Sequence, residues 1–225
     1  MPYADSPPPT FVYLHGFASS GASKKGVELA AIFRCLGHTL WTPDLNLPSF
    51  AKLNHDAMLA EVDRCVAAAP GDGPVRLIGS SLGGWLAARW AQLNPTRVDR
   101  LVLLCPGFDM PTRWPTLLGQ DRMERWKQRG YLPFPDATGA PVAVHWGFIE
   151  AALSHPPTPT PPCPTIIFHG TRDAVVPIES SEAFARAHPG VTLVAVDDDH
   201  SMLASLPKIA ESTIEFFEIK PIAEP

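Results

Sequence analysis

Closely spaced cysteines are missing from this sequence. The four that are present, Cys35, Cys65, Cys105 and Cys163, are separated by tens of residues and form no C-x-x-C pair. This spacing favours neither a zinc site nor a disulfide framework, so we expect no metal. Reduced, mostly buried thiols in a cytoplasmic protein are the expected state.

Long runs of basic or apolar residues are also missing. The formal net charge is -5 at pH 7 and no Lys/Arg run occurs, whereas a nucleic-acid groove needs a basic surface to neutralise phosphates. No apolar run approaches the roughly 18 residues that span a bilayer. Residues 1–10 lack the basic start and apolar core of a signal peptide. We therefore expect no nucleic-acid partner, no membrane partner and a cytoplasmic location.

What is present is an alternation of short apolar strands with amphipathic helices. With 45% hydrophobic and 18% charged residues, residues 1–225 are predicted to form one domain around a sizeable core. Continuous apolar strands between helices indicate a parallel sheet buried on both faces. The predicted fold is α/β, a doubly wound, mostly parallel sheet of about six strands. We expect strands at residues 11–14, 38–42, 75–78, 101–105, 165–168 and 191–196, and helices at 24–36, near 58–69, after 81, at 179–188 and at 206–219.

Residues 106–164 interrupt this alternation. They contain many prolines, including most of the run 156–162, and helix-like pieces at 120–129 and 142–153. A structureless loop of this length is unusual in a compact domain, so we expect an insertion with short helices of its own. Because it follows a sheet strand, it would cover the carboxyl edge as a lid, with Trp114, Trp126 and Trp146 facing the substrate. The alternative is a surface excursion whose aromatic side chains only pack together.

The stretch Gly79-Ser-Ser-Leu-Gly83 lies between an apolar strand and a helical pattern. A strand that turns at once into a helix leaves little room beside the turn, which accounts for the glycines, and forces the apex residue into a strained conformation. Matches of this kind also arise by chance in loops. Here the flanking strand and helix supply the required context, so Ser81 is the candidate nucleophile.

A serine hydroxyl needs a base to remove its proton and a carboxylate to orient that base. After such a turn, the order along the chain is serine, then acid, then histidine. Of the later histidines, His145 and His155 lie in the insertion, His169 ends a strand and His188 ends a helix. His200 lies in a loop just past the last strand, which makes it the candidate base. A metal at His200 is disfavoured because no second His or Cys falls at ligand spacing.

Two aspartates are candidates for the acid. Asp173 follows the penultimate strand by a short loop and could reach the His200 loop from the adjacent strand, whereas Asp109 follows the strand at 101–105. The position of Asp173 in the chain order favours it over Asp109. Residues 197–199 are interpreted as a solvated acidic turn.

Acyl transfer also needs hydrogen-bond donors where the oxyanion forms. The N–H of Leu82, directly after Ser81 and at a helix start, is one candidate donor. The loop after the first strand contains His15-Gly16-Phe17, in which Gly16 lets the backbone turn toward the site and Phe17 supplies the second candidate N–H. By itself the tripeptide would be an ordinary strand-ending turn.

Three motifs together resemble the α/β-hydrolase superfamily. The stretches 13–25, 78–84 and 169–177 are similar to those of the small bacterial YqiA-type esterases. The resemblance implies an α/β-hydrolase fold that lacks the first two strands of the full sheet. It also implies hydrolysis of carboxylic esters or thioesters by Ser81, Asp173 and His200, through an acyl-enzyme and without a cofactor. Superfamily members that carry Asp at the apex, such as haloalkane dehalogenases and epoxide hydrolases, are disfavoured by the serine.

These observations predict a serine hydrolase that acts on a small-molecule ester. An acyl thioesterase of the acyl-CoA type is the second hypothesis, and a non-catalytic ligand-binding protein on a hydrolase fold is the third. A peptidase or an acyltransferase would use the same attacking group, because fold and family do not decide the substrate.

Overall fold

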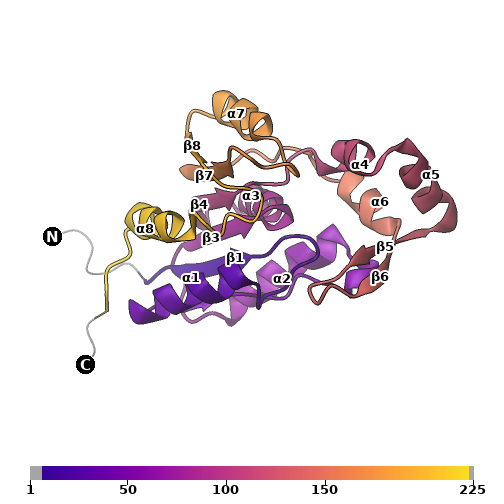
Figure 1. Ribbon diagram of the computed structural model, residues 1–225. Coiled ribbons are helices and arrows are strands. Elements are labelled where there is room, and N and C mark those ends of the chain that lie inside the picture. The colour runs from indigo at the N-terminus through magenta and orange to yellow at the C-terminus, as the bar shows by residue number, and fades with distance from the viewer. Residues whose placement is uncertain (1–6, 223–225) are drawn as a thin grey trace.

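The sheet of this protein has six strands in the order β2-β1-β3-β4-β7-β8 (Figure 1). The computed structural model describes residues 7–222. Every neighbouring pair in the sheet is parallel, which confirms the predicted doubly wound architecture. The strands are β1 Thr10–Leu14, β2 Leu40–Trp41, β3 Val75–Ser80, β4 Val98–Leu104, β7 Thr165–Gly170 and β8 Val191–Val196.

Helices cover both faces of the sheet because alternate strand residues are apolar on both sides. On β1, Phe11 and Tyr13 belong to one hydrophobic core and Val12 and Leu14 to the other. The first core includes residues of α1 and α8, and the second includes residues of α2, α3 and α7. The bounds are α1 Lys24–Cys35, α2 His55–Ala68, α3 Leu82–Leu93, α7 Ile178–Ala187 and α8 Leu206–Phe216, with a 3-10 helix η1 at Phe50–Lys52.

The chain between β4 and β7, here called the β4–β7 segment (residues 106–164), forms a separate group of elements beside the sheet (Figure 1). It leaves the sheet at the carboxyl end of β4. It contains α4 Met110–Leu118, α5 Gln120–Arg129, β5 Tyr131–Pro135, β6 Pro141–His145 and α6 Gly147–Leu153. Helix α5 was predicted from its pattern and agrees with the structure.

The prediction of one helix over residues 142–153 was wrong. Its first part is β6, which pairs antiparallel with β5, and the helix α6 begins only at Gly147. Residues 141–145 are exposed, half-buried, exposed, buried and exposed in turn, a period of two that is typical of a strand. The hairpin turn is closed by Asp136, whose carboxylate accepts hydrogen bonds from Thr138 and from the N–H of Ala140.

In the part of the chain that the structure describes, none of the helices combines the length and the apolar character needed to cross a membrane.

Candidate active site

Ser81 stands at the turn between β3 and α3, with φ 55° and ψ -118°. A non-glycine residue at positive φ is strained and persists only where its surroundings hold it. Here the N–H of Ser81 donates to Leu104 O at 2.9 Å, and its carbonyl accepts from the N–H of Gly107 at 2.8 Å. The flanking glycines are sterically required, since a Cβ on Gly83 would lie 2.1 Å from the carbonyl oxygen of Leu14.

His200 lies between Ser81 and Asp173, which are far from it in the sequence. Its Nδ1 is 2.7 Å from Asp173 Oδ2 and its Nε2 is 3.1 Å from Ser81 Oγ. Because a carboxylate only accepts, Nδ1–H donates to Asp173, which leaves Nε2 free to accept the proton of the serine hydroxyl. The histidine side chain is 25% exposed, so a substrate can reach it.

The side chain of Asp173 is fully buried and hydrogen bonded on both oxygens. Oδ1 accepts the N–H groups of Val175 and Val176 at 2.8 Å each, and Oδ2 faces His200 and lies 3.4 Å from His169 Nε2. Burial alone would raise the pKa of this carboxyl group. The hydrogen bonds from His169, His200 and Val176 outweigh burial and hold its pKa well below the usual range. Asp173 is therefore ionised at neutral pH.

Asp109, the rival acid, is placed differently. It precedes α4 in the left-handed conformation with φ 58°, and its backbone N–H donates to Pro157 O at 3.2 Å. Its carboxylate makes no hydrogen bond to His200, whose Nδ1 partner is Asp173.

The interpretation of residues 197–199 as a solvated acidic turn holds for only part of the turn. Asp198 is only 4% exposed, and its carboxylate accepts the N–H groups of Asp199 at 2.8 Å and Ser205 at 2.7 Å. A buried carboxylate is tolerated where backbone donors satisfy it. Asp198 thus holds the loop that carries His200, while Asp197 forms an exposed ion pair with Arg172.

The loop after β1 packs directly against Ser81. A Cβ on Gly16 would lie 3.1 Å from Ser81 Cβ and 3.7 Å from its Oγ, so a side chain at this position would crowd Ser81. Phe17, whose N–H is a candidate oxyanion donor, follows Gly16 in this loop. Leu82 is the first residue of α3, and the N–H of a first helical residue has no partner within the helix.

Ser81 and His200 line a small pocket of about 130 Å³ together with Gly16, Phe17 and Lys25. The three tryptophans expected at the substrate do not line it. Trp126 is fully buried and donates to Val144 O at 2.8 Å, and Trp114 packs edge-on against Phe17 with ring centroids 5.5 Å apart. Trp146 lines a different hollow, on the β4–β7 segment.

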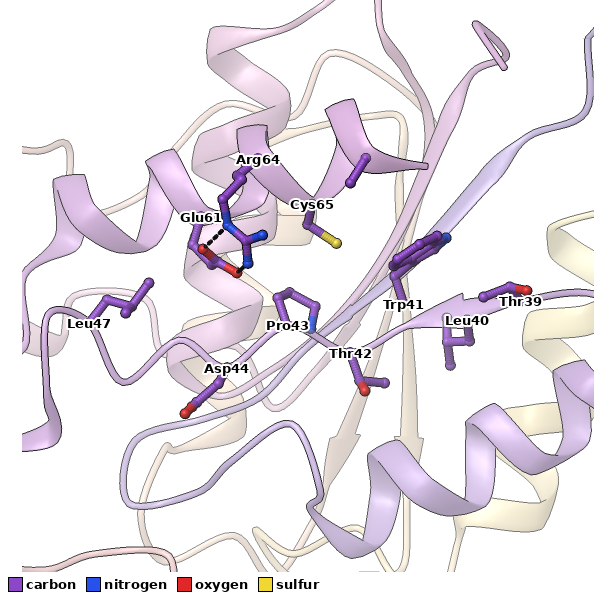
Figure 2. A pocket seen from close by; sticks show the side chains of 11 residues that line it. Thr39, Leu40, Trp41, Thr42, Pro43, Asp44, Leu47, Glu61, Arg64 and Cys65 are labelled. Atoms are coloured by element: carbon purple, nitrogen blue, oxygen red, sulfur yellow. Dashed lines mark hydrogen bonds and ion pairs between the residues drawn. The ribbon is translucent and has the colours of Figure 1, made fainter. Parts of the chain in front are cut away.

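A larger hollow of about 550 Å³ lies between β2 and α2 (Figure 2). The charged groups Glu61 and Arg64 in its wall are paired with each other, with Arg64 Nε 2.8 Å from Glu61 Oε2. Neither Ser81 nor His200 lines this hollow, so it is separate from the candidate active site.

Cys105, His169 and Asp173 form the one cluster in residues 7–222 with donor atoms close enough to hold a metal ion. Both nitrogens of His169 are already used, Nδ1 by Ser181 Oγ at 2.7 Å and Nε2 by Val176 O at 2.8 Å. Burial raises the pKa of the Cys105 thiol, which disfavours the thiolate that a metal needs. Cys105 and His169 are therefore best understood as buried neighbours that support Asp173.

Three residues of this site were not identified from the sequence. Lys25 reaches the pocket from α1, His169 supports Asp173 from β7, and Asp198 fixes the His200 loop. Lys25 and His169 stand inside the stretches that carry the family resemblance, and this is the signal that could have pointed to them. Asp198 looked like its exposed neighbours, and no local pattern distinguishes it.

A doubly wound parallel sheet with a strained serine between β3 and α3 defines the class of α/β-hydrolase folds. Solved structures agree. The alpha/beta hydrolase domain-containing protein 10 from mouse has a TM-score of 0.72 and is 22% identical, with 97% of this chain and 97% of that chain covered. Est1E from Butyrivibrio proteoclasticus has a TM-score of 0.74 and is 19% identical, with 93% of this chain and 87% of that chain covered. At these identities the likeness establishes the fold.

The chain belongs to the uncharacterised protein family UPF0227, whose model matches residues 10–218. The expected resemblance to YqiA-type proteins is thereby confirmed.

Curated relatives are esterases and thioesterases. The palmitoyl-protein thioesterase ABHD10, mitochondrial, of Rattus norvegicus is 28% identical over 185 residues, which are 75% of this chain and 60% of the relative. The pimeloyl-[acyl-carrier protein] methyl ester esterase of Chromobacterium violaceum is 25% identical over 218 residues, 82% of this chain and 84% of the relative. The chain thus spans about 60% of the length of its thioesterase relatives. Its homologues are α/β-hydrolases of the esterase and thioesterase type.

Proposed function

We propose that this protein is a serine hydrolase that cleaves carboxylic esters through an acyl-enzyme intermediate. The observation that carries the proposal is the continuous chain of hydrogen bonds from Ser81 Oγ through His200 to Asp173, at 3.1 Å and 2.7 Å. In the proposal Ser81 is the nucleophile, His200 the general base and Asp173 the group that orients it.

The first half of the reaction transfers the acyl group to the enzyme. His200 Nε2 takes the hydroxyl proton while Ser81 Oγ attacks the carbonyl carbon of the ester. The carbonyl oxygen becomes an oxyanion, for which the N–H groups of Leu82 and Phe17 are the proposed donors. When the bond to the leaving oxygen breaks, His200 returns the proton to that oxygen, and the alcohol departs.

The second half releases the acid. A water molecule gives a proton to His200 and attacks the acyl carbon, and collapse of the second tetrahedral intermediate returns the proton to Ser81 Oγ. Asp173 stays ionised throughout and stabilises the imidazolium that forms twice, because its hydrogen bonds keep its pKa low. The steps use groups of this chain and a water molecule, with no cofactor.

Thioester hydrolysis is the second candidate function. It is favoured by the thioesterase relatives, of which the rat protein is 28% identical. The same attack would expel a thiolate in place of an alkoxide, so the geometry of Ser81 serves both reactions. In either case the proposed partner is a small-molecule substrate and the proposed location is the cytoplasm, although the rat relative is described as mitochondrial.

The proposed role of the β4–β7 segment is to cover this site as a lid. Its aromatic side chains pack against the loop after β1, where Phe17 contacts Trp114, Phe134 and Phe148 with ring centroids 5.4 to 5.5 Å apart. Substrate contact by Trp114, Trp126 and Trp146 stays a prediction. A role of Trp114, with Trp126 packed against it, as a support for Phe17 and its loop agrees better with the burial of these two tryptophans.

A fluorophosphonate probe tests whether Ser81 is activated. Incubation of the purified protein, followed by intact mass and peptide mapping, should give a single adduct on Ser81. The adduct should be absent from His200→Ala and retained in His145→Ala, which removes an exposed histidine on β6. The Ser81→Ala variant should fold normally and lose about three to six orders of magnitude in kcat for an aryl ester. No adduct on folded wild-type protein, or a Ser81→Ala variant with most of its turnover, would contradict the proposal and favour a non-catalytic binding protein.

A further inference from the structure

The pocket beside Ser81 has a mixed polar and apolar lining that includes a cation. Lys25, the second residue of α1, lines it together with residues that carry hydroxyl groups, namely Tyr13, Ser19, Ser80, Ser81 and Ser201. Phe17 supplies an apolar side chain. At about 130 Å³ the pocket accommodates a small group.

The ammonium group of Lys25 has N–H donors that are not used in hydrogen bonds within the described residues. Its Nζ donates to the carbonyl oxygen of Ser201 at 2.7 Å, whereas an ammonium group has three N–H donors. Within residues 7–222 it makes no ion pair, unlike its neighbour Lys24, which is 69% exposed and pairs with Glu28 at 4.0 Å. The nearby carboxylates are already satisfied, Asp198 by backbone N–H groups and Asp199 by Ser201.

The charge of Lys25 is partly removed from water. Burial lowers its pKa, and the neighbouring Cys105 and the carboxylates of Asp198, Asp199 and Asp173 oppose that shift. A cation in such surroundings gains more from a bound anion than an exposed lysine does, because the solvent screens it less.

We propose that Lys25 binds a carboxylate of the substrate, so that the ester this site hydrolyses carries an anionic group near the reacting carbonyl. The inference rests on the proposed function of Ser81 and names the class of its substrate. The carboxylate would lie in the pocket beside His200 and accept from the free N–H groups of Lys25. Such a charge-assisted contact is stronger than a neutral hydrogen bond.

Lys25 also joins α1 to the loop that carries His200, through the carbonyl of Ser201. A role confined to that tether would affect every substrate alike and would lower kcat, because the position of His200 would be disturbed. Recognition of a carboxylate would instead affect charged substrates selectively and would act on KM, since the contact exists before and during the reaction. The two roles can therefore be separated by kinetics.

The test compares matched charged and neutral esters. Monomethyl succinate against methyl butanoate places the carboxylate on the acyl side, and butanoyloxyacetate against ethyl butanoate places it on the alcohol side. For wild-type protein we expect kcat/KM to favour the charged ester by about tenfold to a hundredfold in one of these pairs. Lys25→Met should abolish that ratio, mainly through KM, and Lys25→Arg should keep part of it. Lys24→Met, which removes the same charge one residue away, should keep the wild-type ratio.

Two outcomes would overturn the inference. One is a wild-type protein that labels with fluorophosphonate and hydrolyses both members of each pair equally well. The other is a Lys25→Met variant that slows both members by the same factor, which would make Lys25 a tether alone. Absence of labelling and of turnover in wild-type protein would instead contradict the proposed function itself, so the two failures are distinguishable.

Discussion

The hydrogen bonds of Asp173 illustrate how much of this site is decided by single residues. One carboxylate oxygen is held by backbone N–H groups of Val175 and Val176, which leaves the other to face His200. His169 lies behind it, fully buried and itself bonded to Ser181. The orientation of His200 thus depends on residues that never touch a substrate.

Replacement of the two candidate acids should therefore have unequal effects. Asp173→Asn should lower kcat by about three to four orders of magnitude, because an amide can donate to His200 Nδ1 and then favours the wrong tautomer. Asp109→Asn should stay within about tenfold of wild type, since the carboxylate of Asp109 is not bonded to His200. Steady-state kinetics with an aryl ester, together with a thermal unfolding curve for each variant, checks this. The opposite ranking would reassign the acid.

Elements meet at very short distances around the strained serine. Helix α3 starts so close to β1 that a Cβ on Gly83 would lie 2.1 Å from Leu14 O and 2.6 Å from His15 O. Backbone atoms cannot move aside as a flexible side chain can. The approach of these two elements brings the loop after β1 next to Ser81, so the spacing of the glycines decides where the candidate oxyanion donors lie.

Gly83→Ala should be destabilising although alanine is the better helix former. We expect a loss of about 2 kcal/mol or more in the free energy of unfolding, because the new methyl group forces α3 away from β1. Urea denaturation measures it. Gly147→Ala is the matched control, since a Cβ there meets nothing within 4 Å and the same change should be neutral or slightly stabilising. Equal midpoints for the two variants would show that α3 can shift freely.

In the whole molecule, the β4–β7 segment packs onto the sheet domain through histidines as well as aromatic rings. His55 of α2 stacks on Phe148 of α6 with ring centroids 5.0 Å apart, and it meets Trp85 of α3 in a T-shaped contact at 5.2 Å. His155 lies 6.1 Å from His55, and Nδ1 of His55 is buried without a hydrogen-bond partner among the described residues. This contact favours neutral imidazole.

Stability should consequently fall at mildly acidic pH. The pKa of His55 is lowered from 6.5 to about 4, mainly by burial and also by the neighbouring His155, while Asp56 opposes both. As the pH falls, His55 takes up its proton at a higher pH in the unfolded chain than in the folded protein. Its contribution to the free energy of unfolding is therefore fully present above pH 6.5 and is lost as the pH falls toward 4, a loss on the order of 3 kcal/mol. Urea unfolding at several pH values measures the slope.

The variants for this measurement are His55→Leu and His145→Gln. The first should flatten the slope between pH 6.5 and pH 4, whatever it does to stability at neutral pH. The second removes a histidine exposed on β6 and should leave the slope as in wild type. A wild-type slope in His55→Leu would mean that other groups account for the pH dependence.

The sequence by itself determined the local features of this protein. Apolar runs and helical periodicity predicted the parallel sheet and its helices, because both patterns depend on residues a few positions apart. The glycines around Ser81 predicted the strained turn for the same reason. The hairpin of β5 and β6 was missed because a stretch as short as residues 141–145 does not distinguish the period of a strand from that of a helix.

Tertiary structure decided what depends on distant parts of the chain. Ser81 and His200 are 119 residues apart, and only the fold brings them together. The chain order already favoured Asp173 over Asp109, and the position of β7 beside β8 is what places Asp173 next to His200. The same folding buries Asp198 among identical neighbours and brings Lys25 from α1 into the pocket. Such contacts are made by the packing of whole elements, and a one-dimensional pattern carries no record of which elements meet.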